Sequence, residues 1–114
     1  MATPIATQDI PMAYVALAKL HQLYDGYRQA LRVAGRELLL LQEEGRLYLI
    51  ANRCPHMDAP LHKASVQQYL LRCPVHGIEF DLRNGRPLGT AADCVSPLEF
   101  LPLVYEGNTV GIEL

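Results

Sequence analysis

The chain has 114 residues, half of them hydrophobic, and a formal net charge of only −2. This length predicts one domain, and the apolar share is enough for a core without disulfides. The lack of a basic excess disfavours nucleic-acid binding. Because no apolar run approaches the ~18 residues of a membrane span, none is expected. The N-terminus does not resemble a secretory signal, so we expect a cytoplasmic protein.

In chain order, the first segment mixes small, polar and proline residues without periodicity, and residues 1–12 are predicted to form a flexible tail. The remaining residues, 13–114, are expected to form the domain. A loop with a helical turn is expected over 20–27. Short apolar stretches that are predicted to be strands follow one another at 13–17, 29–33, 37–41, 47–51, 69–71, 78–82, 101–105 and 109–114.

Turn signals separate these stretches, and several are typical of hairpins. The expected turns are Asp25-Gly26, Ala34-Gly35, Glu44-Gly45, Asn84-Gly85 and Gly107-Asn108. Asn84-Gly85 is the pair most typical of a two-residue hairpin. Such regular spacing predicts an all-β fold. The run Leu38–Leu41 is ambiguous, since leucine favours helices, but its short length and the glycines on both sides favour a buried strand.

Two short boxes combine cysteine with histidine: Cys54-Pro55-His56 and Cys73-Pro74-Val75-His76-Gly77. Each box follows an apparent strand and offers one thiolate and one imidazole. Such a set can hold an iron–sulfur cluster whose two irons have different ligands. It can also hold a structural zinc ion. Gly77 suggests a backbone with positive φ or a close approach.

The boxes and their flanks closely resemble the Rieske family, whose pattern is Cys-x-His followed by Cys-x-x-His. The flanking agreement lies in Ala59-Pro60-Leu61 and Phe80-Asp81-Leu82-Arg83-x-Gly85. The resemblance extends over about residues 13–114 and is greatest to small bacterial-type Rieske ferredoxins. It implies an antiparallel β-sandwich with a small cluster-binding subdomain formed by two loops. It also implies a [2Fe–2S] cluster, with Cys54 and Cys73 on one iron and His56 and His76 on the other.

The function that this resemblance implies is one-electron transport by an iron–sulfur ferredoxin. Such a protein is a component of an oxidoreductase system rather than an enzyme. Its expected partners are a flavin-dependent reductase as donor and a terminal oxygenase as acceptor. Two alternatives remain open: a small Rieske subunit of a nitrite-reductase-like complex, and a structural zinc module.

The resemblance also bears on the reduction potential. High-potential Rieske proteins carry two further cysteines, and Ala59 and Val75 stand at those positions here. Ile78 and Phe80 replace a serine and a tyrosine whose hydroxyls bond the cluster region. Fewer donors stabilise the reduced cluster less, so we expect a potential near −150 mV, at about the low end of the class. Ferric iron should lower the pKa of a bound imidazole, so the potential should fall in alkali.

Two departures from the family pattern affect the loops around the site. Asp58 stands where respiratory members have glycine, and the stretch 89–93 lacks the proline common in a third loop. Their effects are left open. Cys94 has no partner box and is expected to be a packed or partly exposed residue without a redox role. His62 and His21 are expected to be solvent-facing loop residues.

Overall fold

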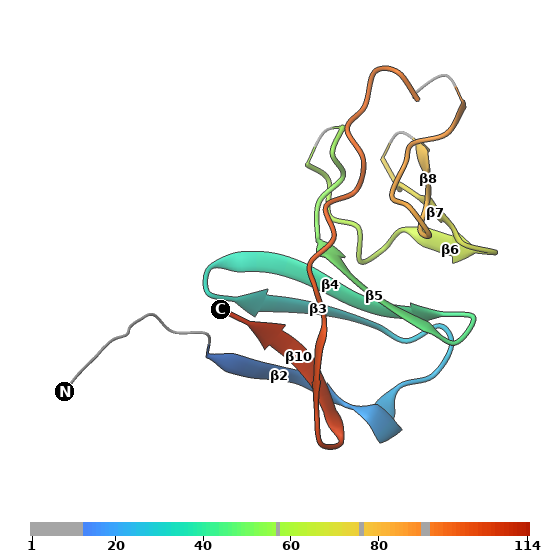
Figure 1. Ribbon diagram of the computed structural model, residues 1–114. Helices are drawn as coiled ribbons and strands as arrows, with labels where there is room; N and C mark the ends of the chain where they lie inside the picture. The colour runs from blue at the N-terminus through green and yellow to red at the C-terminus, as the bar shows by residue number, and fades with distance from the viewer. Residues whose placement is uncertain (1–12, 57, 76, 90–91) are drawn as a thin grey trace. The chain divides into compact units, whose positions relative to one another are not determined.

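The computed structural model describes residues 13–56, 58–75, 77–89 and 92–114. The predicted tail, residues 1–12, and the predicted ligand His76 lie outside the described residues. The chain divides into two compact units, one formed by residues 24–101 and the other by residues up to 23 together with 102–114 (Figure 1). The described part of the chain contains no helix long and apolar enough to cross a membrane.

All the strands pair antiparallel, so the predicted all-β class is confirmed. Three sheets have the strand orders β2-β10-β9, β3-β4-β5 and β6-β7-β8. The 3-10 turn Leu20–Gln22 lies in the predicted loop. The strands are β2 Tyr14–Lys19, β3 Arg28–Val33, β4 Arg36–Glu43, β5 Arg46–Ala51, β6 Ser65–Gln67, β7 Leu70–Arg72, β8 Glu79–Asp81, β9 Val104–Glu106 and β10 Thr109–Glu113.

The β3-β4-β5 sheet is built around the run of four leucines, Leu38–Leu41, all of which are buried in β4. Alternate residues of a strand point to opposite faces, so four consecutive buried leucines mean that both faces of β4 are covered. This confirms the buried-strand interpretation. Both hairpins are tight because Ala34 and Gly35, like Glu44 and Gly45, have positive φ, the conformation of a type I′ turn.

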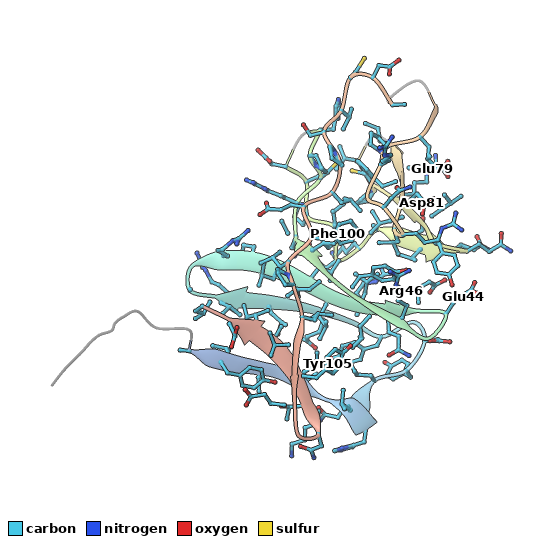
Figure 2. All side chains as sticks on the ribbon, in the orientation of Figure 1. Glu44, Arg46, Glu79, Asp81, Phe100 and Tyr105 are labelled. Carbon is cyan, nitrogen blue, oxygen red and sulfur yellow. The ribbon has the colours of Figure 1, made fainter. Side chains whose placement is uncertain are left out.

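One cluster of buried residues forms the core of the larger unit and joins the β3-β4-β5 sheet to the β6-β7-β8 sheet. Its members are Leu39, Leu41, Tyr48, Ile50, Cys54, Ala59, Leu61, Ala64, Leu71, Cys73, Phe80, Leu82 and Leu98. At its edge the Tyr48 ring packs near Phe100 and lies under the Arg46 guanidinium, 5.6 Å from the ring centre. Figure 2 shows Arg46 and Phe100 between these two sheets. Burial raises the pKa of the Tyr48 hydroxyl.

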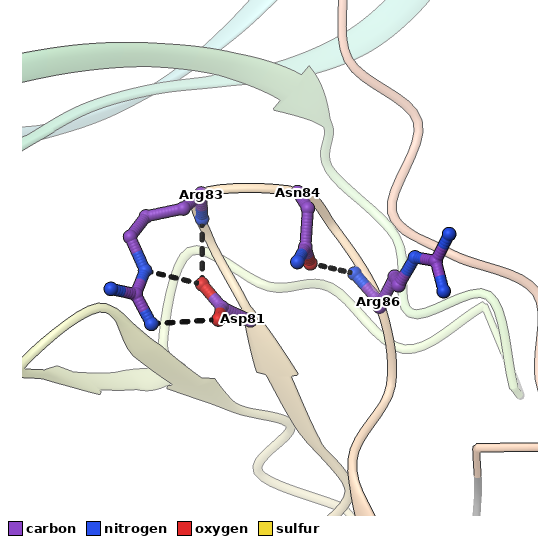
Figure 3. A network of polar contacts seen from close by, with 4 residues as sticks. All are labelled: Asp81, Arg83, Asn84 and Arg86. Atoms are coloured by element: carbon purple, nitrogen blue, oxygen red, sulfur yellow. Dashed lines mark hydrogen bonds and ion pairs between the residues drawn. The ribbon is translucent and has the colours of Figure 1, made fainter.

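The turn after β8 differs in length from the predicted two-residue hairpin. Asp81 N–H donates to the Arg86 carbonyl, and Gly85 N–H donates back to the Asp81 carbonyl, so four residues, 82–85, form the loop. The Asp81 carboxylate accepts from the backbone and guanidinium of Arg83, and Asn84 Oδ1 accepts from Arg86 N–H (Figure 3). These side-chain bonds favour the longer loop. The hydrogen bonds from Arg83 lower the pKa of the Asp81 carboxyl.

The smaller unit is the β2-β10-β9 sheet, and its pairing depends on Gly111. The register between β10 and β2 shifts between Val110 and Gly111, which marks a bulge. A Cβ on Gly111 would lie 2.0 Å from the Val15 carbonyl oxygen. Since that oxygen belongs to the backbone of the paired strand, it cannot move aside cheaply. Gly111 is therefore required by close backbone approach rather than by a positive φ.

We predict that Gly111→Ala lowers the free energy of unfolding by about 2 kcal/mol or more, because β10 must separate from β2 to admit the methyl group. Chemical denaturation of both proteins measures the difference. Gly45→Asn is the matched control, since Gly45 has open space around it and asparagine tolerates positive φ. It should change the stability by less than about 1 kcal/mol. Equal losses in the two variants would contradict the packing argument.

Candidate metal centre

The two cysteine boxes fold into loops with the same backbone hydrogen bonds. Cys54 N–H donates to the Ala59 carbonyl at 2.7 Å, and Asp58 N–H donates to the Cys54 carbonyl at 2.7 Å. In the second box Cys73 N–H donates to the Ile78 carbonyl at 2.9 Å, and Gly77 N–H donates to the Cys73 carbonyl at 2.9 Å. Each loop is therefore closed on its own cysteine, at both the N–H and the carbonyl.

The closure of each loop needs one residue of positive φ, four positions after the cysteine. Gly77 has φ +69° and Asp58 has φ +58°. Glycine takes this conformation without steric cost, whereas an aspartate takes it at a cost of about 1 kcal/mol. The expectation of a special backbone at Gly77 is confirmed. Asp58 keeps the loop path that glycine would favour, and its side chain is exposed.

Both cysteines lie in the core, whereas the described histidine of the set lies at the surface. Cys54 is 0 % exposed and Cys73 is 1 % exposed, and both belong to the core cluster of the larger unit. His56 is exposed. In Figure 1 the segment after β5 and the segment between β7 and β8 lie close together, away from the β3-β4-β5 sheet. The structure thus brings Cys54 and Cys73 into one buried environment.

The histidine of the second box, His76, lies outside the described residues. Among the residues that are described, no three His, Cys, Asp or Glu side chains gather closely enough to hold one metal ion. The four-residue ligand set Cys54, His56, Cys73 and His76 therefore stays a prediction.

The sequence did not single out the residues that hold the first loop in place. Asn52 is buried, and its Oδ1 accepts from Leu61 N–H at 2.8 Å, while its Nδ2 lies 3.3 Å from Nδ1 of His62. Arg28 of β3 donates to the carbonyls of His62 and Ala64. These contacts span 9 to 36 positions in sequence, so no local pattern signals them.

The predictions for His62, Cys94 and His21, which lie outside the two boxes, have different outcomes. His62 is half-buried beside Asn52, so its interpretation as a solvent-facing residue is wrong. The buried amide of Asn52 draws the imidazole inward because a buried polar group needs a partner. Cys94 was expected to be packed or partly exposed, and it is exposed. His21 is exposed, as predicted.

The donor set that the structure describes fits an iron–sulfur cluster. Thiolates are the ligands that iron–sulfur clusters require, and two are present in one dry core region. Phe80, which is fully buried, and the half-buried Ile78 present only apolar side chains near the second loop. The exposure of His56 and the burial of Cys54 and Cys73 fit a cluster that has one covered end and one end at the surface.

The structure is thus an antiparallel β protein with two closed loops, each of which holds a buried cysteine. The family model described as "Rieske [2Fe-2S] domain" matches residues 13–99. The chain therefore belongs to the Rieske [2Fe-2S] domain family. A [2Fe–2S] cluster is the cofactor that this membership implies.

Relatives of known function support the same class. The chain is 31% identical over 108 residues to the ferredoxin component of the alkene monooxygenase system of Xanthobacter autotrophicus, covering 94% of this chain and 85% of the relative. It is 29% identical over 101 residues to the ferredoxin component of the naphthalene 1,2-dioxygenase system of Pseudomonas aeruginosa, covering 89% and 95%. Among solved structures, the ferredoxin of carbazole 1,9a-dioxygenase from Nocardioides aromaticivorans IC177 matches with a TM-score of 0.73 at 30% identity, covering 87% and 95%.

These relatives are electron carriers that serve oxygenase systems, rather than catalysts. The predicted Rieske-type fold, the iron–sulfur cofactor and the role in electron transport are confirmed at this level. The domain bounds 13–114 stay a prediction.

We predict opposite effects for substitutions at the two equivalent loop positions. Asp58→Gly should leave the loop closed and raise the free energy of unfolding by up to about 1 kcal/mol, because the positive φ no longer carries a side chain. Gly77→Ala should lower it by about 1–2 kcal/mol, since φ stays positive and the new Cβ would lie 2.9 Å from Nη2 of Arg72. Thermal unfolding of the cluster-containing protein measures both. A stabilised Gly77→Ala protein would refute the equivalence.

Proposed function

We propose that the protein is a one-electron carrier whose [2Fe–2S] cluster is held by Cys54, His56, Cys73 and His76. When bound, the cluster accepts and releases a single electron. The observation that carries the proposal is the pair of loops with the same backbone closure, each holding a buried cysteine. Such closure presents donor atoms from two rigid turns, which a cluster with fixed geometry requires.

The cysteines and the histidine of the proposed ligand set contribute differently to this function. Cys54 and Cys73 supply negative sulfur donors in a region from which the core excludes water. His56 presents its imidazole at the surface, where a partner protein can approach it. Neutral imidazoles on one iron make the site less negative than four thiolates would, and this raises the potential relative to plant-type ferredoxins.

The donor and the acceptor follow from the relatives. Since the compared relatives are ferredoxin components of a monooxygenase system and of dioxygenase systems, we propose that this chain receives electrons from a flavin-dependent reductase and delivers them to a terminal oxygenase. We further propose that residues 13–114 are the functional domain and that the protein works in the cytoplasm, because a reducing compartment keeps Cys54 and Cys73 available for iron.

We predict that the anaerobically purified protein contains about two irons and two acid-labile sulfides per chain and shows a Rieske-type paramagnetic resonance signal when reduced. His56→Ala and Cys73→Ser should each abolish this signal, because each removes a ligand. Cys94→Ser is the matched control and should keep the signal, since Cys94 is exposed and distant in sequence from both boxes. One zinc per chain without sulfide would refute the carrier function.

We predict a reduction potential of about −150 mV, at the low end of the Rieske class. The physical reason is that buried Phe80 and half-buried Ile78 donate no hydrogen bond that would stabilise the reduced, more negative cluster. Protein-film voltammetry measures the midpoint. Phe80→Tyr should raise the potential if its hydroxyl reaches the cluster region. A midpoint above about +100 mV in the unchanged protein would contradict this assignment within the class range.

A further inference from the structure

An open groove of about 660 Å³ lies against the second cysteine loop and carries two positive charges. Its lining residues are Lys63, Ser65, Arg72, Cys73, Pro74, Val75 and Gly77. Among these residues there are two cations and no carboxylate. The groove therefore has a local positive charge on a chain whose net charge is −2. Clefts lined by one sign of charge concentrate the field and attract oppositely charged groups.

Neither cation of the groove, Lys63 or Arg72, forms a close ion pair with another described residue. By contrast, Arg32, Arg36, Arg53 and Arg83 each pair with a carboxylate. Glu79 is the cross-strand neighbour of Arg72 on β8, where Figure 2 labels it, but it does not line the groove. The charges of Lys63 and Arg72 are thus available to a bound molecule.

The backbone on both sides of Lys63 is held by hydrogen bonds, and the Arg72 side chain lies beside Gly77. The guanidinium of Arg72 lies over Gly77, with Nη2 only 2.9 Å from the position that a Cβ would take. Arg28 donates to the carbonyls on both sides of Lys63. A backbone that is already ordered loses less conformational entropy on binding than a flexible backbone does.

Two exposed apolar residues share the groove with the two cations. Val75 is 59% exposed and Pro74 is also exposed, and both line the groove together with Lys63 and Arg72. Exposed apolar residues combined with charged ones are typical of protein interfaces, so we take a protein rather than a small anion as the occupant. Because Val75 and Pro74 belong to the second cysteine loop itself, an occupant of the groove lies directly beside the proposed cluster.

We propose that this groove, which is lined by Lys63, Arg72, Pro74 and Val75, docks a carboxylate-rich segment of the protein with which the chain exchanges electrons. The proposal rests on the proposed carrier function and adds the chemistry of the partner surface. Acidic side chains of the partner would pair with Lys63 and Arg72 and bring that protein against the second cysteine loop. The attraction steers the encounter and is weakened by salt.

The first test is a binding titration of the oxidised, cluster-containing protein, labelled with ¹⁵N, with a hexaglutamate peptide. The amide signals of Lys63 and Ser65 should shift, and hexalysine should leave them in place. Arg72→Gln should weaken the apparent affinity about two- to fivefold, the loss expected for one exposed ion pair. Lys19→Gln removes the same charge outside the groove and should leave the affinity unchanged. Equal effects of the two variants, or shifts spread over the whole surface, would overturn the proposal.

The second test measures whether the groove guides electron exchange. Ferricyanide takes one electron from the dithionite-reduced protein and becomes ferrocyanide, so no atoms are transferred. The second-order rate constant should fall about tenfold from low to high salt, because salt screens the attraction between the positive groove and the ferricyanide anion. A net negative chain without such a groove would repel ferricyanide, and its rate constant would rise with salt. Arg72→Gln should reduce that salt dependence and Lys19→Gln should not. A rate that rises with salt in the unchanged protein would refute a positive exit surface.

The carrier function and the acidic docking partner are distinguished by these measurements. If the reduced protein lacks the Rieske-type paramagnetic signal, the carrier function itself is wrong. If that signal is present and Arg72→Gln behaves as Lys19→Gln does, the carrier function stands and the acidic docking partner is wrong.

Discussion

The constraint on which the site depends is the closure of each cysteine loop on the backbone of its own cysteine. Cys54 and Cys73 each use their N–H and their carbonyl within the loop, so the polar groups of two buried residues are satisfied locally. The thiols can then lie in the apolar core without leaving backbone groups unpaired. A site that changes charge by one electron benefits from this rigidity, because its donor atoms need to move little between the two states.

In the larger unit, the two cysteines of the site belong to the same packed cluster as the core residues. The cluster of buried residues that contains Leu39 and Ile50 of the β3-β4-β5 sheet also contains both cysteines. The first loop is further tied to this sheet by Arg28 on β3 and by Asn52 just after β5. Core packing thus determines where the thiols lie, while the exposed His56 and Val75 provide the surface at which another protein can meet the site.

Local sequence signals predicted most strands and turns, because both depend on neighbouring residues, but the short strand β6 was not predicted. The four buried leucines and the turns at Ala34-Gly35 and Glu44-Gly45 were predicted correctly. The Asn84-Gly85 turn was predicted two residues too short. There the hydrogen bonds of Asp81 and of the Asn84 side chain outweigh the preference of the Asn-Gly pair. The half-buried position of His62 also escaped prediction, since its partner Asn52 lies ten positions away.

The sequence alone determined the class of this protein, because the kind and spacing of cysteine and histidine residues decide which metal chemistry a chain can support. It also determined the strand rhythm, since side-chain alternation and turn residues act over a few positions. Only the tertiary structure decided that Asp58 takes the conformation of Gly77, and that Lys63 and Arg72 line one groove. Those facts come from segments brought together by the core, and the energies that bring them together are contacts between residues distant in the chain.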